Sequence, residues 1–110
     1  YIAGPYSGDG SLAERIKNTH LAIEYGLALI RMGHTPFIPH LTHYVEEEGS
    51  QRLAYETYLK WDIEWLRQCQ GLVRIPGHSP GADREEKIAR EMGIPIWDTL
   101  WDVPLGVDDE

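Results

Sequence analysis

Short apolar runs alternate with helical patterns along the chain, and this alternation limits the possible folds more than any other feature. The apolar runs lie at 1–4, 35–38, 72–75 and 94–97, and residues with helical apolar spacing fill most of the sequence between them. Strand–helix–strand alternation is typical of a parallel sheet with helices on both faces. We therefore expect an α/β fold with a parallel sheet of four or five strands, the first of them central.

Start and stop signals mark three helices in this pattern. Ser11 followed by Glu14 forms a capping box, and Gly33 ends the helix that it begins. A second helix is expected over 53–69, and a third one ends at Gly93. The order of elements is that of a flavodoxin-like three-layer sandwich, in which ligands bind past the carboxyl ends of the strands.

Two glycine-rich turns follow the first and third expected strands, at 7–10 and 76–81. In a flavodoxin-like sheet both turns flank the ligand crevice. Ser79 before Pro80 is a good helix start, and Gly81 would also let an anion approach the free N–H groups there. This turn is therefore either a helix cap alone or a site for a phosphate or a ribose hydroxyl.

Charge and cysteine content narrow the class of partner. The chain has 110 residues, expected to form one domain over 1–110, with 18 acidic against 10 basic residues and a net charge of −8. Such a surface repels phosphate backbones, so we expect no nucleic acid polymer as a partner. No apolar run reaches about eighteen residues, so we expect no membrane partner. Cys69 is the single cysteine, there is no signal-peptide pattern, and we expect a cytoplasmic protein.

Two acidic residues lie on apolar helix faces, where burying an unpaired carboxylate is costly. Glu85 precedes Ile88 and Ala89 by three and four positions, so it shares the inward face of the third helix. Asp62 lies four residues before Leu66, within or at the edge of the second helix's apolar stripe. Each acid is either paired in the core or functional. Two carboxylates in different environments can divide the roles of acid and nucleophile.

Other polar side chains are compatible with a ligand pocket. Tyr1 opens the first strand and is either a core residue or a hydrogen-bond partner of Glu85. His40 and His43 lie in an expected polar loop over 40–51. No third ligand follows them at a zinc-site spacing, so we expect pocket-lining residues and no metal.

Three segments resemble the nucleoside 2-deoxyribosyltransferase superfamily, which includes the deoxynucleoside 5′-monophosphate N-glycosidases. They are YIAGPYSG at 1–8, WDIEWL at 61–66 and SPGADRE at 79–85, and their order and spacing agree with the family over most of the chain. The resemblance implies a flavodoxin-like fold, a nucleoside or nucleotide as small-molecule partner, no cofactor, and a homodimer or larger homo-oligomer.

The resemblance also implies roles for individual residues. By position, Glu85 matches the nucleophilic glutamate, Asp62 the aspartate that handles protons near the leaving base, and Tyr1 the tyrosine beside the nucleophile. Ser7 stands where the glycosidase branch often has an arginine. The implied substrate-binding residues are Gly4, Tyr6, His40, Ser79 and Gly81.

Three functions remain open at this point. The first is cleavage or transfer of the N-glycosidic bond of a (deoxy)nucleoside or its 5′-monophosphate, by a deoxyribosyltransferase or a nucleotide N-glycoside hydrolase with a glutamate nucleophile. The second is a non-catalytic nucleotide-binding module of the same fold. The third is a small oligomeric scaffold that uses Trp97 and Trp101 as contacts.

Overall fold

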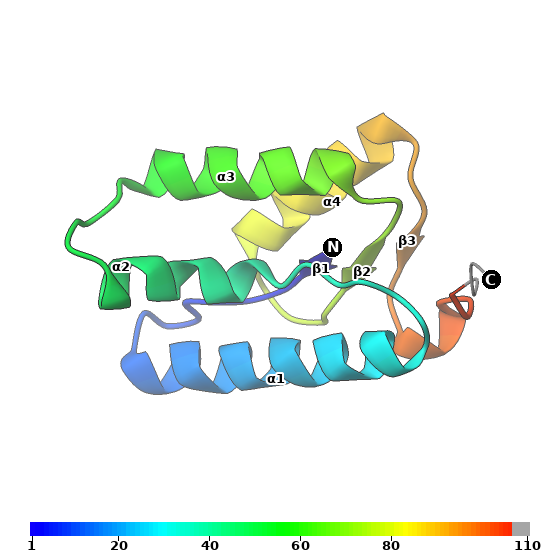
Figure 1. The fold of residues 1–110 in the computed structure, drawn as a ribbon, viewed down its shortest axis with the longest axis horizontal. Helices are drawn as coiled ribbons and strands as arrows, with labels where there is room; N and C mark the ends of the chain where they lie inside the picture. Colours follow the sequence, from blue (N-terminus) through cyan, green and yellow to red (C-terminus); the bar gives the residue numbers. More distant parts are fainter. Residues whose placement is uncertain (107–110) are drawn as a thin grey trace.

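The computed structural model describes residues 1–106. A three-stranded parallel sheet with strand order β1-β2-β3 lies among the helices (Figure 1). The α/β class expected from the sequence is therefore confirmed. The elements in chain order are β1 (Ile2–Ala3), α1 (Leu12–Arg31), η1 (Pro39–His43), α2 (Tyr44–Glu48), α3 (Tyr55–Gln68), β2 (Leu72–Arg74), α4 (Pro80–Met92), β3 (Ile96–Trp97) and η2 (Leu100–Asp102), where η marks a 3₁₀ helix.

The sheet is short, and both of its strand pairs are parallel. Ile2 lies opposite Val73 in the first pair, and Leu72 lies opposite Ile96 in the second. Within the described residues the regular sheet thus has three strands, with β1 at an edge. The expected central position of the first strand is not found.

The segment over 35–38 explains this difference. It was expected to be a strand, and it runs beside β1 without forming regular pairs. One backbone hydrogen bond joins the two, from the Ile2 N–H to the Phe37 carbonyl at 3.0 Å. Pro36 and Pro39 have no N–H to donate, so a regular ladder cannot continue along this segment.

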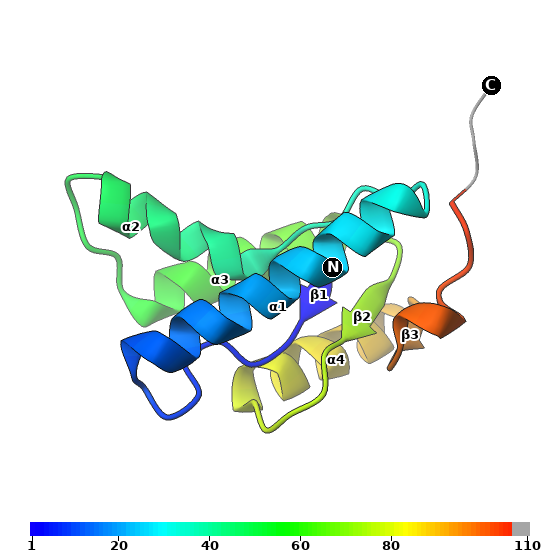
Figure 2. The same cartoon turned by 90° about the horizontal axis from the view of Figure 1, so that it is seen from below.

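Alternate side chains of the sheet pack against helices on its two faces. Tyr1, Ala3 and Leu72 belong to a cluster that includes buried residues of α3 and α4. Ile2 and Val73 belong to a second cluster with buried residues of α1. Figure 2 shows α1 and α4 on opposite sides of β1 and β2. This alternation follows from the two-residue period of a strand.

Helix ends follow the local signals in the sequence. The Ser11 hydroxyl accepts a hydrogen bond from the Glu14 N–H at 3.2 Å, which confirms the expected start of α1. The Ser79 hydroxyl accepts one from the Ala82 N–H at 3.1 Å and caps α4. Gly93 ends α4 with a left-handed φ of 77°, which glycine adopts without strain.

Helix α1 packs closely on one side and is apolar on the other. A Cβ atom on Gly26 would lie 2.6 Å from Ile38 Cδ1, so a larger residue there would require the Ile38 side chain to shift. Ala22 is fully buried on the same face, whereas Leu12 and Ile30 are exposed on the outer side. None of the helices in residues 1–106 is long and apolar enough to cross a lipid bilayer.

The region over 40–51, expected to be a polar loop, contains η1 and α2. His40 and Thr42 are buried, and the Tyr58 hydroxyl of α3 donates a hydrogen bond to the Glu46 carboxylate at 2.7 Å. The polar composition of this region predicted a solvated loop. Tertiary contacts with α3 instead fix it as helix.

Candidate functional site

A cavity of about 690 Å³ opens past the carboxyl ends of β1 and β2. Its walls come from the turn after β1, from α1, η1 and α3, and from the turn that leads into α4. This volume lies in the range of small-molecule sites, which is roughly 300–1,000 Å³. The structure brings seven of the residues predicted from the sequence together in its lining: Gly4, Tyr6, His40, Asp62, Ser79, Gly81 and Glu85.

Glu85 is held at the cavity by Tyr1. Helix α4 directs Glu85 inward, on the face that also carries the buried residues Ala82 and Ala89. The Tyr1 hydroxyl donates a short hydrogen bond to Glu85 Oε2. Burial and the negative charges of Glu85 and Asp62 raise the pKa of Tyr1 above its usual range, so its hydroxyl remains a donor. Tyr1 itself is not among the residues that line the cavity, and its hydrogen bond restricts the orientation of the Glu85 carboxyl group.

Opposing effects set the charge of Glu85. Burial raises its pKa to about 7. The Tyr1 hydrogen bond and the positive charge of Arg74 act in the other direction and favour the carboxylate. Arg74 is fixed by an ion pair with Asp83 at 2.9 Å. Glu85 is therefore a carboxyl group that ionises near neutral pH and has donors ready for its charged form.

Asp62 has a different environment. It lies on the inward face of α3, one turn after the buried Tyr58 and one turn before the buried Leu66. Burial and the negative charge of Glu85 raise the pKa of Asp62 to about 7. Its Oδ1 atom is buried and has no hydrogen-bond partner. Of the two acids, only Glu85 has a donor and a nearby cation for its charged form, which favours a shared arrangement with the charge on Glu85 and the proton on Asp62.

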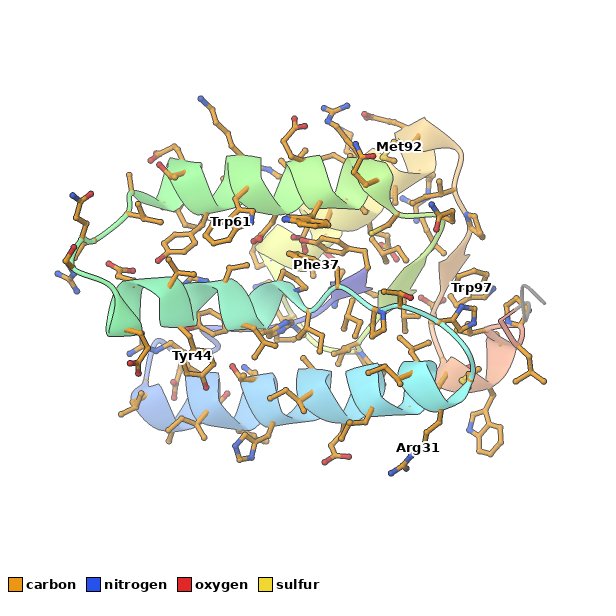
Figure 3. The ribbon with its side chains drawn as sticks, in the orientation of Figure 1. Arg31, Phe37, Tyr44, Trp61, Met92 and Trp97 are labelled. Carbon is orange, nitrogen blue, oxygen red and sulfur yellow. The ribbon has the colours of Figure 1, made fainter. Side chains whose placement is uncertain are left out.

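A column of aromatic rings forms part of the wall. His43 stacks on Tyr6 with ring centroids 4.2 Å apart and on Tyr58 at 4.4 Å. Tyr58 in turn faces Trp61 at 6.4 Å, and Figure 3 shows Trp61 on the inner side of α3. Flat rings of this kind suit stacking with a nucleobase. Sequence reasoning missed Tyr58, although its place four residues before Asp62 puts both on one helix face.

Two nitrogen atoms of the lining lack partners as well. The Arg15 Nε of α1 and the His40 Nδ1 of η1 are buried without a hydrogen-bond partner. Together with Asp62 Oδ1 they are the three such side-chain atoms in the part of the chain that the structure describes, and all three residues line this cavity. Buried polar groups are normally paired, so the lining of this one cavity concentrates the unsatisfied hydrogen-bonding capacity of the described residues.

The other candidate residues have ordinary surroundings. The Cys69 Sγ contacts the Trp65 carbonyl at 3.3 Å at the end of α3. Trp97 is partly buried against the core, whereas Trp101 is 96% exposed. Within residues 1–106 no group of three His, Cys, Asp or Glu side chains is arranged to hold a metal ion.

Comparison with known proteins places this site within a family domain. A protein-family model matches residues 1–99. The chain belongs to the family described as Domain of unknown function (DUF7768). No curated protein and no solved structure matches the chain. The matched residues include the whole lining of the cavity, so the site is part of the DUF7768 domain.

Proposed function

We propose that the protein cleaves the N-glycosidic bond of a (deoxy)nucleoside or its 5′-monophosphate in this cavity, or transfers the sugar to a second base, with Glu85 as the nucleophile. The pairing of Glu85 with Asp62 in one cavity carries this proposal. Both pKa values are about 7, but only Glu85 has a hydrogen-bond donor and a nearby cation for its charged form. One carboxylate and one carboxylic acid then coexist at neutral pH, as a nucleophile and a general acid require.

In the first step the Glu85 carboxylate attacks C1′ of the sugar, and the bond between C1′ and the base nitrogen breaks. The electron pair of that bond goes to the base, which takes a proton from the Asp62 carboxyl group. Tyr1 holds Glu85 in position for this attack. The product is a glycosyl ester of Glu85, as in retaining glycosidases. Proton transfer from a positioned acid contributes roughly 10²–10⁴ in rate.

In the second step an acceptor attacks C1′ and releases Glu85. If the acceptor is water, the Asp62 carboxylate takes its proton and the free sugar leaves. If the acceptor is a second base, Asp62 takes the proton from its attacking nitrogen and a new nucleoside forms. The chemistry uses no metal and no cofactor.

The proposal also includes the fold relationship, the oligomeric state and the cellular location of the protein. The arrangement of layers supports a flavodoxin-like relationship, with the segment at 35–38 beside β1 in the place of a further strand. The exposed aliphatic side chains of α1 support a homodimer or larger homo-oligomer. We place the enzyme in the cytoplasm on the basis of its single cysteine.

Base release from a panel of substrates tests the proposal. The protein is incubated with deoxynucleosides and their 5′-monophosphates, with and without a second free base, and products are separated by chromatography. Release alone indicates a hydrolase, and base exchange indicates a transferase. Ligand-induced stabilisation without any product would favour the binding module and reject the enzyme.

Matched variants assign the roles. We expect Glu85→Gln to lose turnover and to bind substrate, because the amide keeps the shape and the Tyr1 contact but cannot attack C1′. Glu86→Gln changes the neighbouring carboxyl, which is paired with Arg90 at 3.7 Å outside the cavity, and should keep full activity. Equal turnover by Glu85→Gln and the wild type would exclude Glu85 as the nucleophile.

A further inference from the structure

We infer that Arg15 and His40 form a subsite for a phosphate monoester, on the side of the cavity formed by α1 and η1. That this phosphate belongs to a nucleotide rests on the proposed function. The subsite itself is argued from the residues around it.

The first observation is an arginine without a counter-charge. Arg15 lines the cavity, and its Nε is buried without a hydrogen-bond partner. The chain carries a net charge of −8, yet among the side chains that the structure describes no acidic group forms an ion pair with Arg15. Leaving a buried charged donor unpaired costs more than a typical hydrogen bond gains. A ligand oxyanion would satisfy it.

The second observation is the lone pair of His40, a side chain only 4% exposed. Its Nε2 lies 2.9 Å from the Pro5 carbonyl, which can only accept, so Nε2 carries the hydrogen. Burial lowers the pKa of His40, which keeps the ring neutral. Nδ1 is then an acceptor, and it has no partner. It requires a donor from the ligand.

Arg15 and His40 also meet in a second space. A small cavity of about 30 Å³ adjoins the large one, and both residues line it together with Tyr6 and Thr19. A space of this size holds one or two water-sized atoms, so a phosphate group bound by these residues lies in the large cavity, which Arg15 and His40 also line.

A phosphate monoester matches this pair chemically. Its charged oxygens accept from the guanidinium of Arg15, which suits phosphate geometry. With a second pKa of about 6, a monoester also keeps a protonated oxygen in part of its population, and that oxygen can donate to His40 Nδ1. A carboxylate at neutral pH offers only acceptors, so it would satisfy Arg15 and leave His40 unpaired.

The start of α4 is the competing position. There the Ser79 hydroxyl is already engaged with the Ala82 N–H at 3.1 Å. A Cβ atom on Gly81 would meet nothing within 4 Å, so Gly81→Ala adds a methyl group to open space without disturbing the protein. That methyl group would hinder a phosphate bound at the helix start.

Calorimetric titration of phosphate-bearing and phosphate-free ligands tests the inference. Each variant is made with Glu85→Gln so that nucleotides are not consumed. The ligands are 2′-deoxynucleosides, their 5′-monophosphates, deoxyribose 5-phosphate and inorganic phosphate. We expect Arg15→Gln to weaken the binding of every phosphate monoester by roughly 10- to 100-fold and to leave nucleoside affinity unchanged. Arg15→Lys should retain part of the phosphate affinity that Arg15→Gln loses, because lysine keeps the positive charge but lacks the paired N–H donors of the guanidinium group.

Two controls make the result specific. Lys17→Gln removes the same charge from the exposed side of the same helix and should change no affinity. Gly81→Ala should leave the ratio of monophosphate to nucleoside affinity unchanged. The inference is overturned if Arg15→Gln leaves this ratio intact, or if Gly81→Ala abolishes it while Arg15→Gln does not.

The outcomes also separate this inference from the proposed function. If deoxyribose 5-phosphate binds through Arg15 and no nucleoside is bound or cleaved, the subsite stands and the glycosidase proposal fails. If nucleosides are cleaved with no preference for a phosphate and no effect of Arg15→Gln, the enzyme stands and the subsite fails.

Discussion

The carboxyl group of Glu85 should make the protein less stable as the pH rises from 4 to 8. In the unfolded chain Glu85 ionises near 4.5, whereas burial raises its pKa in the folded protein to about 7. Below pH 4.5 both states are protonated and its contribution to stability is complete. Between these two pKa values the unfolded chain releases the proton and the folded protein keeps it, so folding becomes less favourable.

The size of the effect follows from the difference between the two pKa values. Each tenfold change in proton concentration across this interval changes the free energy of unfolding by about 1.4 kcal/mol for one proton. Glu85 alone then accounts for a loss of roughly 3 kcal/mol between pH 4 and pH 8. Asp62, whose pKa is also raised to about 7, contributes in the same direction.

Urea unfolding of the wild type and of Glu85→Gln, from pH 4 to 8 at constant ionic strength, measures this difference. We expect Glu85→Gln to gain roughly 3 kcal/mol over the wild type across this range, because its amide does not titrate. Glu86→Gln, which changes a carboxyl outside the cavity, is the control. Parallel curves for the wild type and Glu85→Gln, within about 0.5 kcal/mol, would refute the claim that burial raises the pKa of Glu85.

Two further predictions concern rate and packing. The pH profile of kcat/KM for base release should be bell-shaped with its maximum near 7, because Glu85 must be ionised and Asp62 protonated. Asp62→Asn should remove the alkaline limb of this profile. A flat profile between pH 6 and 8 would contradict the assignment of the two roles. A Cβ atom on Gly4 would lie 2.7 Å from Ile75 Cβ, so Gly4→Ala should lower the free energy of unfolding by roughly 1–3 kcal/mol. Gly81→Ala, with nothing within 4 Å, should cost less than Gly4→Ala in the same urea titration.

Local chemistry predicted the helices well. Ser11 and Ser79 cap α1 and α4 with their own hydroxyls, and such contacts depend only on residues a few positions away. The inward placement of Glu85 and Asp62 also follows from helical spacing alone. Both side chains line one cavity because of how α3 and α4 are placed relative to the sheet. The spacing of residues in the sequence does not predict this tertiary arrangement.

Tertiary contacts account for what the sequence did not predict. The prediction of a strand over 35–38 was wrong, although the apolar pattern of this segment is typical of a strand. Its prolines have no backbone N–H groups, so the segment lacks donors that the hydrogen bonds of a regular sheet require. Arg15 was missed because a charged residue on a helix is usually solvated. A signal was present, since Arg15 precedes the buried residues Thr19 and Ala22 by four and seven positions and so lies on their inward face.

Different structural elements hold the carboxyl groups and the aromatic rings of the cavity. Tyr1 belongs to a buried cluster next to β1, and its hydroxyl is hydrogen-bonded to Glu85 of α4. Tyr6 lies in the turn after β1 and stacks on His43 of η1, which stacks in turn on Tyr58 of α3. Substitutions in the turn or in η1 can therefore change the shape of this part of the lining while Glu85 and Asp62 stay in place. A family built on this plan can change which molecule it accepts without altering the groups that would act on it.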